Sequence, residues 1–406
     1  DTERGGSSVL QSNSTAVPSN FIGSPNFLSN GFSGTANIND AQDYVSWTFR
    51  KAPKFFDIVT YTGNTVGNSA QTISHGLGST VGMIIVKRYS TADNWAVWHR
   101  YNANAVGFLN LTDQFYTANA SSFISSVSST SFTVGESLNT NGASFVAYVF
   151  AHNDSGDGEF GPDGDQDIIK CGSYSGNGSA SGPSINLGFE PQFLMIKRAS
   201  GANGWNVFDT MRGWTNNAGY VDNTIAWNTS DAEGTGFYWH NPTSTGFDIA
   251  ASNDNVNANG DTYIYMAIRK GSLFTPTDAT KVFNIGTYGA NRDNSSTSTY
   301  YAGFPVDMAI KKVPVTSGAN NYVSTRMLGT TDLRTNSSAA ERTGETEETF
   351  DSNTHWNKAV GTNTNSQSWM WKRAPSYFDV VAYTGNNNYY TSQNVNHNLG
   401  VVPEMI

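Results

Sequence analysis

The chain has 406 residues, of which 14% are charged and 13% are aromatic, and its formal net charge is −10. This share of large rings excludes an intrinsically disordered chain, and an acidic balance without a lysine- or arginine-rich stretch argues against nucleic acid as a partner. No apolar run is long enough to cross a membrane. The single cysteine, Cys171, excludes an intrachain disulfide and any multi-cysteine metal site.

A tyrosine motif divides the chain into units of domain size. Each copy follows a short apolar run, and the tyrosines are 113, 114 and 95 residues apart. Self-similarity at such spacing is typical of tandem modules. The copies are Tyr61-Thr-Gly-Asn64, Tyr174-Ser-Gly-Asn177, Tyr288-Gly-Ala-Asn291 and Tyr383-Thr-Gly-Asn386.

Two further strands recur in the same order within the units. Apolar runs that end in two basic residues, at 83–88, 194–198 and 308–312, predict a buried strand in the first three units. Trp95 and Trp205 stand seven residues beyond the first two runs, and core packing is the favoured role for both rings. Aromatic-rich runs then predict a closing strand at 44–50, 145–150, 263–269 and 368–373.

The first and last units match most closely. Eight residues, from Trp47 and Pro53 to Met83, recur exactly 322 positions later as Trp369, Pro375 and so on to Met405. The last unit is cut in the middle of a strand, so we expect the chain to be a segment of a longer repetitive protein.

Short apolar runs separated by Asn, Gly, Ser and Asp clusters predict an all-β chain of tandem β-sandwich modules, of jelly-roll type and about 100 residues each. Short Pro-bearing joints predict a fairly stiff string of modules. The expected divisions are 1–53 as an N-terminal region or the tail of a preceding module, 54–155, 156–272 and 273–375 as modules, the third divergent, and 376–406 as the start of a further module.

Several of these motifs together resemble repeat proteins of tailed phages that infect marine bacteria. They are 56–64, the His75-Gly-Leu-Gly78 turn, 83–88, 203–208, 263–270 and 276–283, and the likeness covers roughly residues 44–406. The resemblance implies a virion structural protein, often a fibre or appendage, built of concanavalin-like or jelly-roll modules. The third unit lacks the tryptophan and the histidine turn, which departs from the pattern.

Signatures of catalysis are largely absent. The chain has no Gly-x-Ser-x-Gly elbow, P-loop, His-Glu-x-x-His or Cys-x-x-Cys motif, so we expect a non-enzymatic protein without a catalytic residue or a certain cofactor. The six histidines show no metal-like spacing, and His75 and His397, which share one turn position, are expected to cap a turn.

The densest acidic run, at 154–167, has two interpretations. Asp163, Asp165 and Asp167 alternate along the chain, which would let a loop turn three carboxylates toward Ca²⁺, although the run is incomplete as an EF-hand. The alternative is a solvated linker, and the sequence favours it.

Two tryptophans, Trp98 and Trp214, are the candidates for a ligand surface, because exposed rings can stack on sugars. The leading function hypothesis is a virion fibre, spike or tail appendage located on the extracellular particle. Its expected partners are other copies of itself, with a trimer favoured, other virion proteins and a host-surface glycan. A secreted bacterial adhesin and a glycan depolymerase with two catalytic carboxylates are the alternatives.

Overall fold

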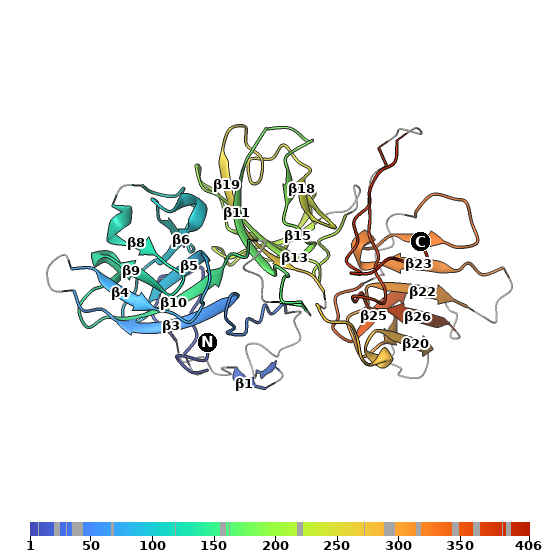
Figure 1. The fold of residues 1–406 in the computed structure, drawn as a ribbon, viewed down its shortest axis with the longest axis horizontal. Coiled ribbons are helices and arrows are strands. Elements are labelled where there is room, and N and C mark those ends of the chain that lie inside the picture. The colour runs from blue at the N-terminus through green and yellow to red at the C-terminus, as the bar shows by residue number, and fades with distance from the viewer. Residues whose placement is uncertain are drawn as a thin grey trace.

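The computed structural model shows three β-sandwich modules that follow one another along the long axis of the molecule (Figure 1). Within the described chain, no helix has the length and hydrophobicity needed to span a bilayer. The structure describes residues 1–6, 8–19, 25–29, 31–34, 44–65, 69–117, 119–154, 160–161, 163–216, 222–271, 273–287, 297–313, 318–342, 349–359, 366–383, 385–386 and 391–406.

The first module packs a five-stranded antiparallel sheet against a three-stranded one. The larger sheet has the order β3 (Phe56–Thr62), β10 (Ser144–Ala151), β5 (Val81–Arg88), β6 (Trp95–His99) and β7 (Gly107–Phe108). The smaller sheet has the order β4 (Gln71–Ser74), β9 (Ser131–Val134) and β8 (Ile124–Val127).

The second module repeats this plan with one more strand. Its large sheet has the order β11 (Ile169–Ser175), β19 (Thr262–Arg269), β13 (Pro191–Arg198), β14 (Asn206–Asp209), β15 (Asp222–Ala226) and β16 (Gly234–Phe237). Its small sheet has the order β12 (Ser184–Asn186), β18 (Gly246–Ile249) and β17 (His240–Thr243).

The third module keeps the large sheet and reduces the small one. The large sheet has the order β20 (Phe283–Thr287), β26 (Gln367–Trp371), β22 (Met308–Lys312), β23 (Tyr322–Thr325) and β24 (Asp332–Arg334), and β21 (Thr297–Tyr301) pairs with β25 (His355–Ala359). Outside the modules, β1 (Asn26–Leu28) and β2 (Gly31–Ser33) form a hairpin. Short 3₁₀ turns lie at Arg100–Asn102, Ala120–Ser122, Glu136–Leu138, Ala279–Lys281 and Arg326–Leu328.

All three modules close in the same way. The last strand of each module inserts between the first and third strands, so that β10, β19 and β26 each pair with two neighbours. The predicted buried runs become β5, β13 and β22, and three of the four predicted closing runs become β10, β19 and β26. The prediction of an all-β chain of tandem β-sandwich modules is therefore confirmed. The prediction of a closing strand at 44–50 is wrong, because these residues form no strand pairing with any described part of the chain.

The tyrosine motif ties the end of the first strand to the loop before the closing strand. The ring of Tyr61 stacks on Phe145 of β10 with centroids 5.0 Å apart, and its hydroxyl donates to the Leu138 carbonyl at 3.0 Å. The backbone N–H of Asn64 then donates to Oδ1 of the fully buried Asn139 at 2.8 Å. Burial of these polar groups is tolerated because each one shown here has a partner.

The second copy of the motif repeats these contacts. Tyr174 stacks on Tyr263 of β19 at 5.1 Å and donates to the Val256 carbonyl at 2.8 Å, while the Asn177 N–H donates to Oδ1 of the buried Asn257 at 2.8 Å. Tyr61 and Tyr174 therefore have equivalent places in their sandwiches. The third copy, at 288–291, lies outside the described residues.

The glycine of the motif is required by close backbone approach. A Cβ atom on Gly63 would lie 2.2 Å from the Thr140 carbonyl oxygen, and one on Gly176 would lie 2.2 Å from that of Ala258. The fourth copy differs, because no described atom lies within 4 Å of the equivalent point on Gly385. This close approach therefore depends on the loop before the closing strand, which packs on the glycine in the first and second modules.

We predict that Gly63→Ala and Gly176→Ala each lower the free energy of unfolding by about 1–3 kcal/mol, because an added methyl group forces the backbone apart. The control is Gly385→Ala, which carries the same change in the same motif and should leave stability within about 0.5 kcal/mol of the parent. Urea denaturation followed by tryptophan fluorescence measures all three. Equal losses in the three variants would contradict a role for this backbone approach.

Candidate functional site

The first and second modules share one apolar core. A single cluster of buried side chains runs from Met83 and Phe150 of the first module to Cys171, Met195 and Met266 of the second. The two modules touch so closely that a Cβ atom on Gly82 would lie 2.6 Å from Sγ of Cys171. An interface of this kind resembles a domain interior and holds the two modules as one body.

Two buried histidines complete this junction in their neutral form. His99 lies 3.2 Å through Nε2 from the Tyr265 carbonyl of the second module, and its Nδ1 accepts the Tyr101 N–H at 3.4 Å. His152 accepts the Cys171 N–H through Nδ1 at 3.2 Å. Burial lowers the pKa of His99 to about 3 and that of His152 to about 4. Protonation of either Nδ1 would remove an acceptor, so these contacts require neutral rings.

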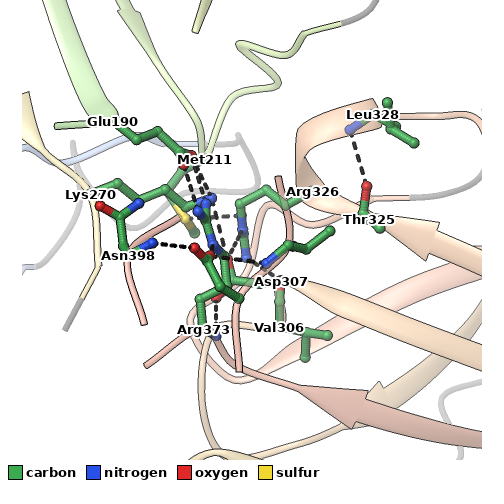
Figure 2. Close-up of polar contacts among 12 residues, drawn as sticks. Glu190, Met211, Lys270, Val306, Asp307, Thr325, Arg326, Leu328, Arg373 and Asn398 are labelled. Carbon is green, nitrogen blue, oxygen red and sulfur yellow. Dashed lines mark hydrogen bonds and ion pairs between the residues drawn. The ribbon is translucent and has the colours of Figure 1, made fainter. Parts of the chain in front are cut away.

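The second and third modules meet instead through a buried ionic network (Figure 2). Arg373, just after β26, places Nη1 and Nη2 2.7 Å from the two carboxylate oxygens of Glu190, which precedes β13. Lys270, just after β19, lies 3.3 Å from Glu190 and 3.6 Å from Asp307 of the third module. Nε of Arg326 lies 3.3 Å from the same Asp307 oxygen, Oδ1, that Lys270 faces. Charges from both modules therefore alternate through a buried junction.

Opposite charges outweigh burial in fixing the state of these carboxylates. Burial alone would raise the pKa of Glu190, but Lys270 and Arg373 hold it below its usual range. Burial would likewise raise the pKa of Asp307, and Lys270 and Arg326 hold it low. Both groups are therefore ionised at neutral pH, and their partners are fully engaged. The arrangement suits a joint that fixes the position of one module on the next.

The network extends into the start of the fourth unit. Arg373 Nε pairs with Asp379, whose Oδ2 accepts the Asn398 N–H at 2.7 Å. In the first unit Asp57 has the same place: it lies 3.1 Å from Lys51 and accepts the Gly76 N–H at 2.6 Å. The 322-residue repeat is therefore also a repeat of geometry, in which Arg373 takes the place of Lys51 and also reaches across to Glu190.

The predicted histidine turn is confirmed. His75 accepts the Leu77 N–H through Nδ1 at 3.3 Å, and His397 accepts the Leu399 N–H in the same way at 3.3 Å. Ring nitrogens that accept from the backbone two residues later stabilise a tight turn.

The predicted aspartates line an open pocket, but they do not form a metal centre. Asp165 and Asp167 border a cavity of about 530 Å³ that Lys170 and Arg269 also line, while Asp163 is exposed and does not line it. Asp167 lies 3.1 Å from Nζ of Lys170, so a cation already neutralises it. In the described parts of the chain, no three His, Cys, Asp or Glu side chains gather as ligands, which corrects the calcium prediction. Residues 155–159 of the acidic run lie outside the described residues.

The two tryptophans predicted as a ligand surface are interior residues. Trp98 is 9% exposed and its Nε1 donates to the Ala103 carbonyl at 3.2 Å; Trp214 is 1% exposed and donates to the His240 carbonyl at 3.3 Å. Neither ring offers a free face for stacking, which corrects that prediction. The core role predicted for Trp95 and Trp205 is confirmed, since both are buried.

The second module also contains a buried titratable pair that the sequence did not predict. Asp222 Oδ2 and His240 Nδ1 lie 3.7 Å apart, and neither atom has a hydrogen-bond partner among the described residues. Burial raises the pKa of Asp222 to about 8 and lowers that of His240 to about 3, so the pair is largely neutral at pH 7. Neither residue lines the pockets next to the network or the aspartates.

We predict that Glu190→Gln lowers the free energy of unfolding by about 3–5 kcal/mol, because it leaves Arg373 and Lys270 buried without their counter-charge. The matched control is Glu233→Gln, which breaks the more exposed pair with Arg212 and should cost at most about 1 kcal/mol. Differential scanning calorimetry would show an earlier transition of the third module in the first variant only. Similar traces for both variants would contradict a coupling role for the network.

A second prediction concerns the stability of the fold at acidic pH. The folded-state pKa of His99 lies below its unfolded value of 6.5, so its contribution to stability is complete above pH 6.5 and is lost as the pH falls toward 3. His99→Gln keeps an amide donor for Tyr265 and removes the titration. We expect the variant to lose less stability between pH 6.5 and 4 than the parent, by up to about 1.4 kcal/mol per pH unit. Parallel curves for variant and parent in chemical denaturation would refute this assignment.

Comparison with known proteins bears mainly on the first two modules. No curated protein and no solved structure matches the chain. A family model described as Domain of unknown function (DUF7483) matches residues 1–270, which ends one residue after β19 and so takes in the N-terminal region and the two modules that share a core. The chain belongs to this family of unknown function.

Proposed function

We propose that the chain is a non-enzymatic structural component of a phage virion, of the fibre, spike or tail-appendage type. The observation that carries the proposal is the way successive modules are joined. The first and second modules are joined by a continuous apolar core. The second and third are joined by a buried ionic network, to which both modules contribute charged residues. Joints that bury their contacts restrict bending, and a stiff row of modules sets a fixed reach from a particle.

Self-association is part of this proposal, with a trimer as the favoured state. The β1–β2 hairpin exposes Phe27, Leu28 and Phe32 at 46%, 54% and 42%. A two-stranded hairpin of this size is marginal by itself, and exposed aromatic and aliphatic side chains are suited to burial against another chain. Repeated weak contacts with a host glycan across several chains would then gain avidity through a raised effective concentration.

We predict that the chain copurifies with infectious particles through a density gradient and is identified in them by mass spectrometry. Its stoichiometry relative to the capsid protein should be a small multiple of three if a trimeric appendage carries it. Immunogold labelling of intact particles locates the part that contains it. Recovery of the chain only from bacterial surface filaments would contradict the proposal and favour an adhesin, and release of reducing ends from host polysaccharide would favour a depolymerase.

A further inference from the structure

Two different segments of the chain occupy the same kind of site on two modules. On the first module the site consists of Lys87 at the end of β5 and Trp95 at the start of β6; on the second it consists of Lys197 of β13 and Trp205, just before β14. We call each pair a Lys–Trp socket. All four side chains are buried, with Lys87 at 0% and Lys197 at 1% exposed.

Within each socket the ammonium group lies over the indole. Nζ of Lys87 is 5.9 Å from the centre of the Trp95 ring, and Nζ of Lys197 is 6.0 Å from that of Trp205. Each amine also donates to a carbonyl of its own module, Lys87 to Asp93 at 2.6 Å and Lys197 to Asn203 at 2.6 Å. A buried ammonium needs further acceptors, because desolvation penalises its charge.

The further acceptor comes from outside the module in both cases. Lys87 donates to the Thr15 carbonyl at 2.9 Å, and Lys197 donates to the Thr112 carbonyl at 2.9 Å. The same two carbonyls accept a backbone N–H of the socket loop, from Asp93 at 2.9 Å and from Asn203 at 2.6 Å. Thr15 lies in the N-terminal region, whereas Thr112 belongs to the first module.

The indole N–H groups also bond to the incoming segments. Nε1 of Trp95 donates to the carbonyls of Gln11 and Ser14, each at 3.0 Å, and Nε1 of Trp205 donates to the Phe108 carbonyl at 3.0 Å. Both segments end in Asn-x-Thr, as Asn13-Ser-Thr15 and Asn110-Leu-Thr112. Residues 11–15 therefore occupy on the first module the place that residues 108–112 occupy on the second.

We propose that the Lys–Trp socket is a docking site for a turn segment of this chain that ends in Asn-x-Thr, supplied by a neighbouring module or by a second copy, and that residues 11–15 are an exchangeable occupant of the first socket. The socket bonds to backbone carbonyls of its occupant, so both segments satisfy it although they share only the Asn-x-Thr ending. Segment exchange between copies would join two chains through a contact already used within one chain.

The third module lies outside this proposal. Tyr322 stands where the other modules have the socket tryptophan, and the guanidinium of Arg342, from the same module, lies 4.9 Å from its ring centre. A side chain of the module itself thus covers the aromatic ring there.

The test uses the full chain with a specific protease site placed within 35–43. After cleavage, gel filtration separates any released N-terminal fragment, and fluorescence anisotropy follows a labelled synthetic peptide of residues 106–116. We expect the cleaved chain to bind this peptide and unlabelled peptide 8–19 to compete with it. Uncleaved protein should bind at least tenfold more weakly, because its tethered segment occupies the socket.

Two matched variants locate the binding. Lys87→Met should weaken binding of the peptide to the cleaved chain at least tenfold, while Lys281→Met, the same change at an exposed lysine outside both sockets, should leave it unchanged. If labelled peptide 8–19 rebinds but peptide 106–116 does not, the sockets are not equivalent and the proposal is overturned. It is equally overturned if neither peptide binds, or if Lys87→Met has no effect.

Discussion

Closure of each sandwich by its last strand is the constraint on which the rest of the structure depends. β10, β19 and β26 each enter between the first and third strands of their module, which lie far from them in the sequence, so a module has no complete sheet until its end is in place. The tyrosine motif stabilises this closure, because its ring stacks on the closing strand and its asparagine bonds to the preceding loop. Strand pairing of this long range also gives the high contact order that is typical of slowly folding β proteins.

The modules are joined by two physically different kinds of contact. Apolar burial between the first and second modules is nondirectional and tolerates small shifts, whereas the ionic network between the second and third requires each guanidinium and carboxylate at its place. The family match coincides with the apolar pair. The charged joint is therefore the place where a different module could be attached without disturbing the shared core.

The fold could be predicted from the sequence because short apolar runs, turn residues and recurring motifs are local signals. Equivalent places for Tyr61 and Tyr174, and for His75 and His397, followed from spacing alone. The ionic junction could not be predicted, since Glu190, Lys270, Asp307 and Arg373 are each unremarkable in sequence and meet only after the second and third modules fold. The burial of Trp98 and Trp214 could not be predicted, because local sequence does not reveal which side chains a second layer covers.

The lone thiol of the chain lies within the apolar joint between the first two modules. Cys171 is fully buried against Gly82, and burial raises its pKa, so the reactive thiolate is suppressed while the two modules remain in contact. The rate at which an alkylating reagent consumes this thiol therefore reports how often the joint opens. Under a pulling force, alkylation of Cys171 would therefore mark each chain in which the first two modules have separated.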